Sequence, residues 1–174
     1  MNFGVELGDG YSLVLRTADS VKEMHDLTLK NLERLREWEP WAQIEQTLEG
    51  TAAYTQFQLE QFVKGSAVPG MIMRGDKAIG SASLKIDAYM QTAELGYWID
   101  EDAEGRGVVT RACTRIIEHA ESVGVRRLEI RTAVGNSRSA AVAERLGFER
   151  EGVLRQALPV GADRLDVAIY GRVL

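Results

Sequence analysis

A glycine-containing loop runs into an amphipathic helix at Asp102-Ala103-Glu104-Gly105-Arg106-Gly107-Val108-Val109-Thr110-Arg111. Gly105 and Gly107 let the backbone turn sharply, and a ligand can approach them without interference from a Cβ. The first N–H groups of a helix lack partners inside it, and the helix dipole adds partial positive charge there. Arg106 can add charge-assisted hydrogen bonds. The stretch favours an anion site suited to a pyrophosphate, although two glycines also suit a plain strand-to-helix turn.

The residues on either side of the loop predict a β-loop-α-β crossover. Ala93–Ile99 is rich in aromatic and branched residues, which is typical of a strand. After the loop, a helix is predicted from Val108 to Val123, closed by Gly124, because apolar residues recur at helical spacing. These residues are Val109, Ala112, Cys113, Ile116, Ile117 and Ala120. A second strand is predicted at Leu128–Thr132.

The rest of the chain mixes hairpins with helices. Further strands are predicted at 11–16, 71–74, 78–86, 148–157 and 164–170, and helices at about 19–37, 47–63 and 136–146. Gly75-Asp76 predicts a tight hairpin turn, and Phe57, Leu59, Phe62 and Val63 are the expected apolar side of the second helix. We therefore expect an α/β fold with a mixed central sheet of about 6–7 strands and about 4 helices.

Composition limits the class of protein. The length of 174 residues favours one domain over 1–174, and the net charge of −5 lacks the basic footprint of a nucleic-acid binder. A single cysteine, Cys113, excludes an intrachain disulfide and a cysteine-rich zinc site, and we expect no metal. Met1–Glu6 carries no signal-peptide pattern and no apolar stretch approaches about 20 residues, so we expect a cytoplasmic protein that is not a membrane protein.

Two well-known phosphate-binding loops do not fit the sequence. The dinucleotide fingerprint needs a glycine where this chain has Thr110, which argues against a Rossmann-type nucleotide-binding protein. The NTPase loop needs Gly-Lys-Ser/Thr, but Gly107 is followed by Val108 and Val109.

Three motifs in order resemble the GNAT superfamily of acetyl-CoA-dependent N-acetyltransferases, in particular its RimJ/RimL-type branch, which acetylates the N-terminal amines of ribosomal proteins. The motifs are Glu94-Leu95-Gly96-Tyr97-Trp98-Ile99, the glycine loop, and the run from Asn136-Ser137-Arg138-Ser139 through Leu146-Gly147-Phe148 to Glu151-Gly152. The chain departs from the superfamily pattern at two positions. Asp102 stands where Arg or Gln is usual, and Ala143 stands where many members have a tyrosine.

The resemblance implies a GNAT-type fold with acetyl-CoA as cosubstrate and no metal. The strand 94–99 would splay from 128–132, and pantetheine would pair with the strand backbone in the gap between them. The resemblance also implies which residues bind acetyl-CoA. For its pantetheine arm these are Ile99, Asp100 and Glu101, with Asn136 on the pantetheine or carbonyl side. For its pyrophosphate they are Gly105, Arg106, Gly107, Val108, Val109 and Thr110.

Catalytic candidates follow from the chemistry of acyl transfer to an amine, which needs a neutral amine and a protonated leaving thiol. Within the resemblance, Ser139 is the candidate that protonates the CoA sulfur, although a serine near a helix start also bonds backbone. Glu94 is the candidate general base, directly or through water, although a strand carboxylate can instead order an arginine or a loop. Glu151 is a second candidate carboxylate.

The acceptor side carries aromatic and acidic residues. Trp38, Trp41 and Glu39 could bind a cationic amine, although the tryptophans could equally pack as core. We expect an acyl-CoA and a primary amine as partners, with a protein N-terminus, a polyamine, an amino acid or an antibiotic as candidate acceptors and a homodimer as a candidate assembly. A non-catalytic acyl-CoA-binding module on the same fold is the alternative function.

Overall fold

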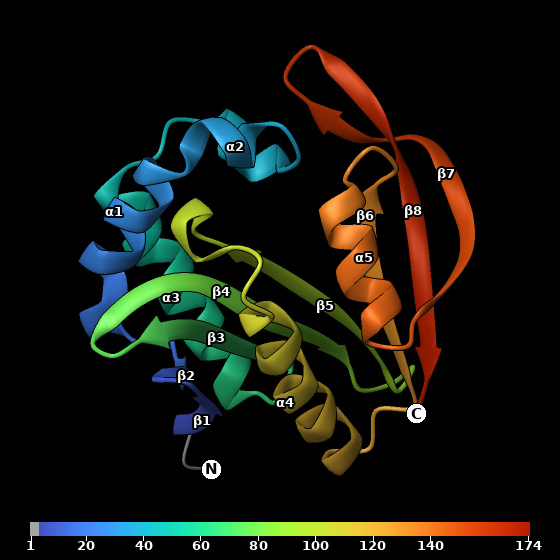
Figure 1. The fold of residues 1–174 in the computed structure, drawn as a ribbon, viewed down its shortest axis with the longest axis horizontal. Coiled ribbons are helices and arrows are strands. Elements are labelled where there is room, and N and C mark those ends of the chain that lie inside the picture. Colours follow the sequence, from blue (N-terminus) through green and yellow to red (C-terminus); the bar gives the residue numbers. More distant parts are fainter. Residues whose placement is uncertain (1–3) are drawn as a thin grey trace.

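The computed structural model describes residues 4–174 and has eight strands and five α-helices in that range (Figure 1). Met1–Phe3, part of the segment inspected above for a signal peptide, lie outside the described residues. The strands are β1 (Gly4–Gly8), β2 (Tyr11–Leu15), β3 (Ala67–Arg74), β4 (Lys77–Asp87), β5 (Thr92–Ile99), β6 (Arg127–Ala133), β7 (Glu149–Val160) and β8 (Asp163–Val173). The helices are α1 (Val21–Lys30), α2 (Leu32–Arg36), α3 (Leu48–Val63), α4 (Val108–Ser122) and α5 (Ser137–Arg145), with short 3-10 turns η1 (Ala18–Ser20), η2 (Pro40–Gln43) and η3 (Glu101–Ala103).

The strands form one mixed sheet in the order β1-β2-β3-β4-β5-β6-β8-β7. The pair β5–β6 is parallel and the other pairs among the described residues are antiparallel. The α/β fold with a partly parallel sheet is therefore confirmed. The sequence did not predict β1, whose five residues are bounded by glycines and become a strand by pairing with β2.

Helices cover both faces of the sheet (Figure 1). Alternate residues of a strand point to opposite faces, and neighbours on β3 show which helix lies on each. Ile72 belongs to the main core with α4 and α5, whereas Met71 packs with Met24 and Leu27 of α1. The apolar stripe of α4 is confirmed, since Ala112, Cys113, Ile116, Ile117 and Ala120 are all buried, and Val109 packs on the same core.

The predicted helix over 19–37 is divided in the structure. It breaks between α1 and α2 at Asn31, whose backbone lies at φ −103° and ψ 9°. The Asn31 side chain donates to Leu27 O at 3.0 Å and to Asp100 Oδ1 at 3.1 Å, and such bonding competes with regular helix geometry.

The predicted apolar side of α3 is wrong in part. Phe57 is 53% exposed and Val63 is 86% exposed, whereas Leu59 and Phe62 are half-buried. The buried residue of this helix is Thr55, whose hydroxyl accepts a hydrogen bond from Arg16 Nε at 2.8 Å. The helix lies at the periphery, so only a narrow stripe is covered. No helix among residues 4–174 is long and apolar enough to cross a lipid bilayer.

Candidate active site

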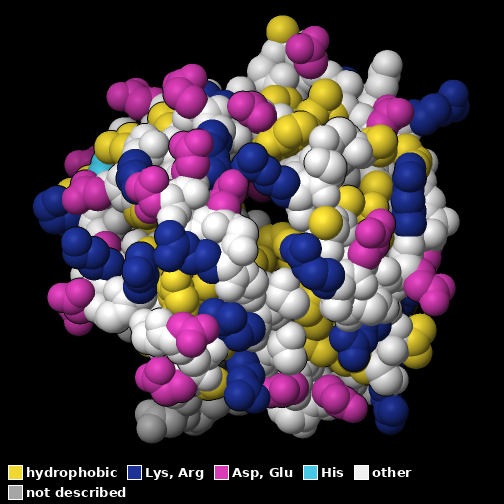
Figure 2. Space-filling view, in the orientation of Figure 1, with side chains coloured by type: hydrophobic (Ala, Val, Ile, Leu, Met, Phe, Trp, Pro, Cys, Tyr) yellow, Lys and Arg dark blue, Asp and Glu magenta, His cyan; other side chains and the backbone are white. Residues whose placement is uncertain are grey.

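A gap opens in the middle of the sheet, between β5 and β6. The two strands pair only where Thr92–Glu94 lies beside Arg127–Glu129, and beyond that point they diverge. The space-filling view shows a hollow near the centre of this face, between the segment after β5 and α5 (Figures 1 and 2). The splayed strands expected from the resemblance are therefore present.

The backbone of β5 offers unpaired polar groups to this gap. Asp100 N donates to Ile79 O of β4 at 2.7 Å, and alternate residues of an antiparallel strand face the same partner. Trp98 therefore faces β4 as well, whereas the N–H and C=O groups of Tyr97 and Ile99 face the gap. An extended ligand with its own amides, such as pantetheine, can pair with them as an added strand does.

Of the three residues expected to hold pantetheine, only Ile99 offers free backbone donors. The Asp100 N–H is used by β4, and the Glu101 N–H donates to Asn31 Oδ1 at 3.1 Å. Their carbonyls accept from Ala103 N and Glu104 N, because both residues enter the turn of η3. In this structure the amides of Asp100 and Glu101 hold the loop, and the expectation that these two residues bind pantetheine stays a prediction.

The glycine loop has the geometry of an anion site. Gly105 lies at φ 73° and Gly107 at φ 68°, in the left-handed region that favours glycine. Gly107 is the N-cap of α4 and has no side chain with which to cap it, so the N–H groups of Val108, Val109 and Thr110 begin the helix without intrahelical partners. Arg106 is exposed and spends one nitrogen on Asp102 O at 3.3 Å, which leaves its other nitrogens for a phosphate.

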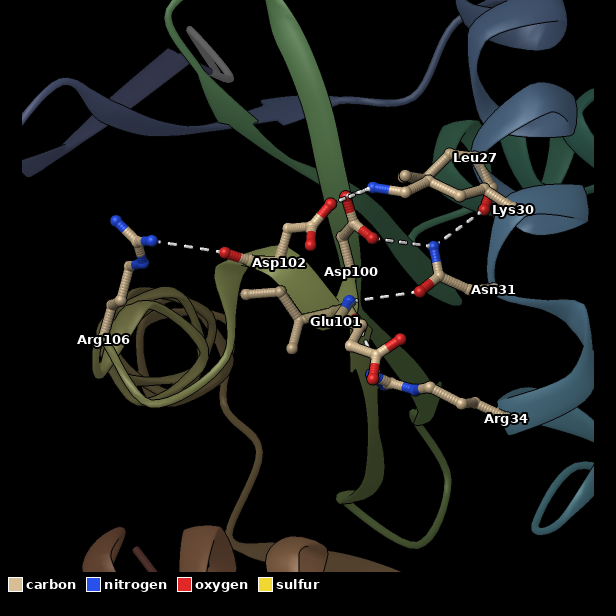
Figure 3. Close-up of polar contacts among 9 residues, drawn as sticks. Leu27, Lys30, Asn31, Arg34, Asp100, Glu101, Asp102 and Arg106 are labelled. Carbon is tan, nitrogen blue, oxygen red and sulfur yellow. Dashed lines mark hydrogen bonds and ion pairs between the residues drawn. The ribbon is translucent and has the colours of Figure 1, made fainter.

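Polar contacts join this loop to the break between α1 and α2 (Figure 3). Lys30 Nζ lies 2.7 Å from Asp100 Oδ2 and 2.6 Å from Asp102 Oδ2, which accounts for the aspartate that departs from the superfamily pattern. Burial raises the pKa of Asp100, but hydrogen bonds from Lys30 and Asn31 more than offset it, so the pKa lies below its ordinary value. The glycine loop is therefore fastened to the helices on the other face of the sheet.

Arg34 extends the same connection into the gap. Its Nη2 donates to Ile99 O at 3.2 Å and lies 2.9 Å from Glu104 Oε1, and the other oxygen of that carboxylate, Oε2, lies 2.7 Å from Arg138 Nη1. The Nη1 atom of Arg34 is buried and has no hydrogen-bond partner among the described residues. A free donor thus lies beside the carbonyl that faces the gap. Sequence reasoning missed Arg34, since nothing distinguishes it locally from Arg36.

Ser139 and Asn136 stand at the start of α5, on the far wall of the gap. The Asn136 Oδ1 atom accepts from Ser139 N at 3.1 Å and so caps the helix. The Ser139 hydroxyl lies 3.1 Å from the Tyr97 hydroxyl, and Tyr97 also donates to Ser139 O at 3.0 Å. Burial raises the pKa of Tyr97, although its bond to Ser139 lowers it, so the phenol stays protonated and can donate.

Tyr97 was missed by sequence reasoning, although a signal for it existed. The family position where many members have a tyrosine is Ala143 here, and its side chain is fully buried in α5. The hydroxyl beside Ser139 comes instead from β5, and strand alternation puts Tyr97 on the same side as Ile99.

The two candidate carboxylates have different surroundings. Glu94 is exposed on β5, at the point where the strands begin to diverge, and its side chain makes no ion pair or hydrogen bond with another described residue. Glu151 pairs with Arg127, and this bond lowers the pKa of the carboxyl below its ordinary value. Glu151 is therefore occupied, whereas Glu94 is available to a ligand.

The connection after α2 spans the upper end of the gap. The ring of Trp38 lies 3.6 Å from the point where a Cβ on Gly135 would stand, just before Asn136. Glu39 is half-buried and accepts from Trp41 Nε1 at 2.8 Å, while Trp41 itself is 40% exposed. Trp38 thus packs against a neighbouring loop, which is one of the two alternatives expected for the tryptophans, whereas Trp41 and Glu39 remain accessible.

The structure holds no group of three or more His, Cys, Asp or Glu residues placed to bind a metal ion, within residues 4–174. Cys113 is fully buried, and burial raises the pKa of its thiol. The prediction that it is a core residue is confirmed.

Comparisons with known proteins agree with this geometry. The model of the family described as Acetyltransferase (GNAT) domain matches residues 12–149. The chain is 33% identical over 172 residues to the ribosomal-protein-serine acetyltransferase of Escherichia coli (strain K12), covering 98% of this chain and 96% of that protein.

Solved structures show the same similarity. RimL, a ribosomal L7/L12 alpha-N-protein acetyltransferase in complex with coenzyme A, matches with a TM-score of 0.94 and 28% identity, covering 98% of each chain. The microcin C7 self-immunity acetyltransferase MccE in complex with acetyl-CoA and AMP matches with a TM-score of 0.92 and 26% identity, covering 100% of this chain and 98% of that one. The chain belongs to the GNAT family of acetyltransferases.

Proposed function

We propose that this protein transfers the acetyl group of acetyl-CoA to a primary amine, and that the α-amine of a protein N-terminus is the acceptor. The observation that carries the proposal is the gap itself, where the backbone of Tyr97 and the N–H of Ile99 face the space between β5 and β6, beside the loop of Gly105 and Gly107. The acceptor class is supported by the relatives named for acetylating ribosomal proteins. We retain one domain over 1–174 and a cytoplasmic location as predictions.

In the proposed complex, pantetheine pairs with β5 and pyrophosphate lies at the start of α4, so the thioester reaches the gap near Ser139. The amine nitrogen attacks the thioester carbonyl, the C–N bond forms, and the C–S bond breaks when the tetrahedral intermediate collapses. The nitrogen loses its surplus proton as the amide forms, the thiolate takes the hydroxyl proton of Ser139, and the proton from nitrogen restores that hydroxyl. The contact with Tyr97 holds the Ser139 hydroxyl in place. Holding both substrates together supplies roughly 7–11 kcal/mol of the rate enhancement.

A second candidate acceptor is a small-molecule amine, because MccE is similar over the whole chain and is named for self-immunity to a microcin. The two candidates differ in what surrounds the amine. An N-terminal residue is followed by peptide bonds, and the buried, unpaired Nη1 of Arg34 offers a donor to a peptide carbonyl. This unpaired donor supports the peptide as the acceptor.

The test measures thiol release from acetyl-CoA with peptides that begin with serine or alanine, alongside polyamines and aminoglycosides. We expect release with the peptides, and mass spectrometry should place the acetyl group on the α-amine. The matched control is the same peptide with a blocked N-terminus and a free lysine. Acetylation of the polyamine alone would replace the proposed acceptor, and tight CoA binding without turnover on any amine would favour a non-catalytic module.

A further inference from the structure

The segment from the last residue of α2 to the end of η2, here the α2–η2 turn (residues 36–43), is held in one shape by its own hydrogen bonds. Arg36 Nε donates to Ala42 O at 3.2 Å, and Gln43 Nε2 donates to Arg36 O at 2.7 Å and to Glu39 O at 3.3 Å. Ala42 N also donates to Glu39 O, at 3.1 Å. The backbone that carries Glu39 is therefore fixed, and its carboxylate has a defined place.

The α2–η2 turn lies against the loop before α5, on one wall of the gap. On one side, Trp38 packs on Gly135, the residue before Asn136. On the other side, Gln43 Oε1 lies 3.5 Å from the point where a Cβ on Gly161 would stand, at the turn between β7 and β8. The α2–η2 turn thus bridges the loop before α5 and the tip of the β7–β8 hairpin. Glu39 lies between Trp38 and Gln43 in the chain. Figure 1 shows the segment after α2 close to the tip of the β7–β8 hairpin.

The Glu39 carboxylate has no cationic partner among residues 4–174. Its Oε2 accepts from the neutral indole of Trp41, and no described residue hydrogen-bonds to its Oε1. Among the charged groups on the neighbouring elements, Arg36 pairs with Glu33, Arg34 pairs with Glu104, Arg164 donates to Gln156 O, and Asp166 accepts from Gln156 N. Arg155 of β7 is exposed and does not pair with Glu39. A half-buried carboxylate without a counter-charge is costly, and a cationic ligand would relieve that cost.

We propose that Glu39 binds the ammonium group of the acceptor and takes its proton, so that Glu39 rather than Glu94 is the general base. This inference rests on the proposed function, because it needs an amine as the second substrate. The proton moves from the ammonium nitrogen to Glu39 Oε1, and the neutral amine then attacks the thioester carbonyl. When the C–S bond breaks, the nitrogen gives up its second proton, the thiolate takes the hydroxyl proton of Ser139, and the proton from nitrogen restores that hydroxyl. Glu39 then releases its proton to solvent.

The protonation chemistry of Glu39 suits this role. Burial raises the pKa of Glu39 to about 7, although the hydrogen bond from Trp41 lowers it. A free α-amine has a pKa of about 8, so proton transfer between the two groups is nearly balanced, as efficient general-base catalysis requires.

The test compares Glu39→Gln with Glu94→Gln and with the matched control Glu37→Gln, an exposed glutamate just beyond α2. The kcat/KM for an N-terminal peptide is measured from pH 5 to 10. We expect Glu39→Gln to lose about 100-fold or more with an unchanged KM for acetyl-CoA, and Glu37→Gln to match the wild type. The acid limb near pH 7 should vanish in Glu39→Gln, leaving activity that follows the ionisation of the peptide amine. Thermal melting with and without CoA separates misfolding from loss of the base.

Trp41→Phe supplies a second measurement that does not remove the carboxylate. Losing the indole donor destabilises the carboxylate anion and raises its pKa, so the acid limb should move upward by about half a unit or more. An acid limb that stays in place in Trp41→Phe, or a large loss in Glu94→Gln with none in Glu39→Gln, would overturn the inference. If the wild type acetylates only small amines, the proposed acceptor fails, and the same variants assayed on that amine still decide the role of Glu39.

Discussion

Replacing Gly107 with alanine tests whether the left-handed backbone of the loop is needed for CoA. Gly107 lies at φ 68°, and a Cβ built there would find its nearest atom, Arg111 Nη1, at 3.9 Å. The substitution therefore causes no clash, and its cost is that of a left-handed alanine, about 1–2 kcal/mol. Because the glycine loop is exposed, the empty variant can relax, and CoA must restore the strained conformation when it binds.

We therefore expect Gly107→Ala to raise the dissociation constant of CoA by about 5- to 30-fold, which corresponds to that cost. Isothermal titration calorimetry measures the constant directly. Gly124→Ala is the control, because Gly124 ends the same helix at φ 88° with no atom within 4 Å of an added Cβ. A CoA affinity within twofold of the wild type for Gly107→Ala, or an equal loss in both variants, would refute the reasoning.

Other substitutions test the walls of the gap. Tyr97→Phe should lower kcat about fivefold with an unchanged KM for acetyl-CoA, since one neutral hydrogen bond to Ser139 contributes about 1 kcal/mol. If the double variant Tyr97→Phe/Ser139→Ala loses far more activity than either single variant, the two hydroxyls are not coupled. Asn31→Ala should lower the free energy of unfolding by about 1–3 kcal/mol, because the buried Asp100 carboxylate loses a donor; an unchanged urea midpoint would be inconsistent with this. Cys113 should react with a thiol reagent at pH 8 only in denaturant, which absorbance of the released chromophore reports.

The sequence predicted the parts of the fold that depend on local patterns. The glycine loop and α4 could be found because helical periodicity, left-handed glycines and an exposed helix start all lie within one stretch. The hairpin of β3 and β4 was found for the same reason, through Gly75 at its turn. Elements whose signals are short and agree with each other are readable without knowledge of the tertiary structure.

The rest of the site depends on contacts between distant segments. Arg34 becomes part of the gap only because α2 lies against Ile99, and Asn31 breaks its helix by bonding Asp100, 69 positions away. Periodicity could not reveal either, because the competing interaction is tertiary. The aromatic neighbours of Glu39 predicted that it binds the amine substrate. That its carboxylate has no cationic partner could be seen only in the three-dimensional structure.

The two glycines under the α2–η2 turn have a consequence for exchanging acceptor specificity between relatives. An added Cβ would lie 3.6 Å from the Trp38 ring at Gly135 and 3.5 Å from Gln43 Oε1 at Gly161, and both are ordinary contact distances. A host with alanine in place of Gly135 therefore still has room for residues 36–43 as a graft. Gly161 differs because its φ of 59° strains any residue with a Cβ, whatever the space around it. Backbone conformation at the tip of the β7–β8 hairpin, rather than side-chain volume, thus limits which hosts can accept the graft.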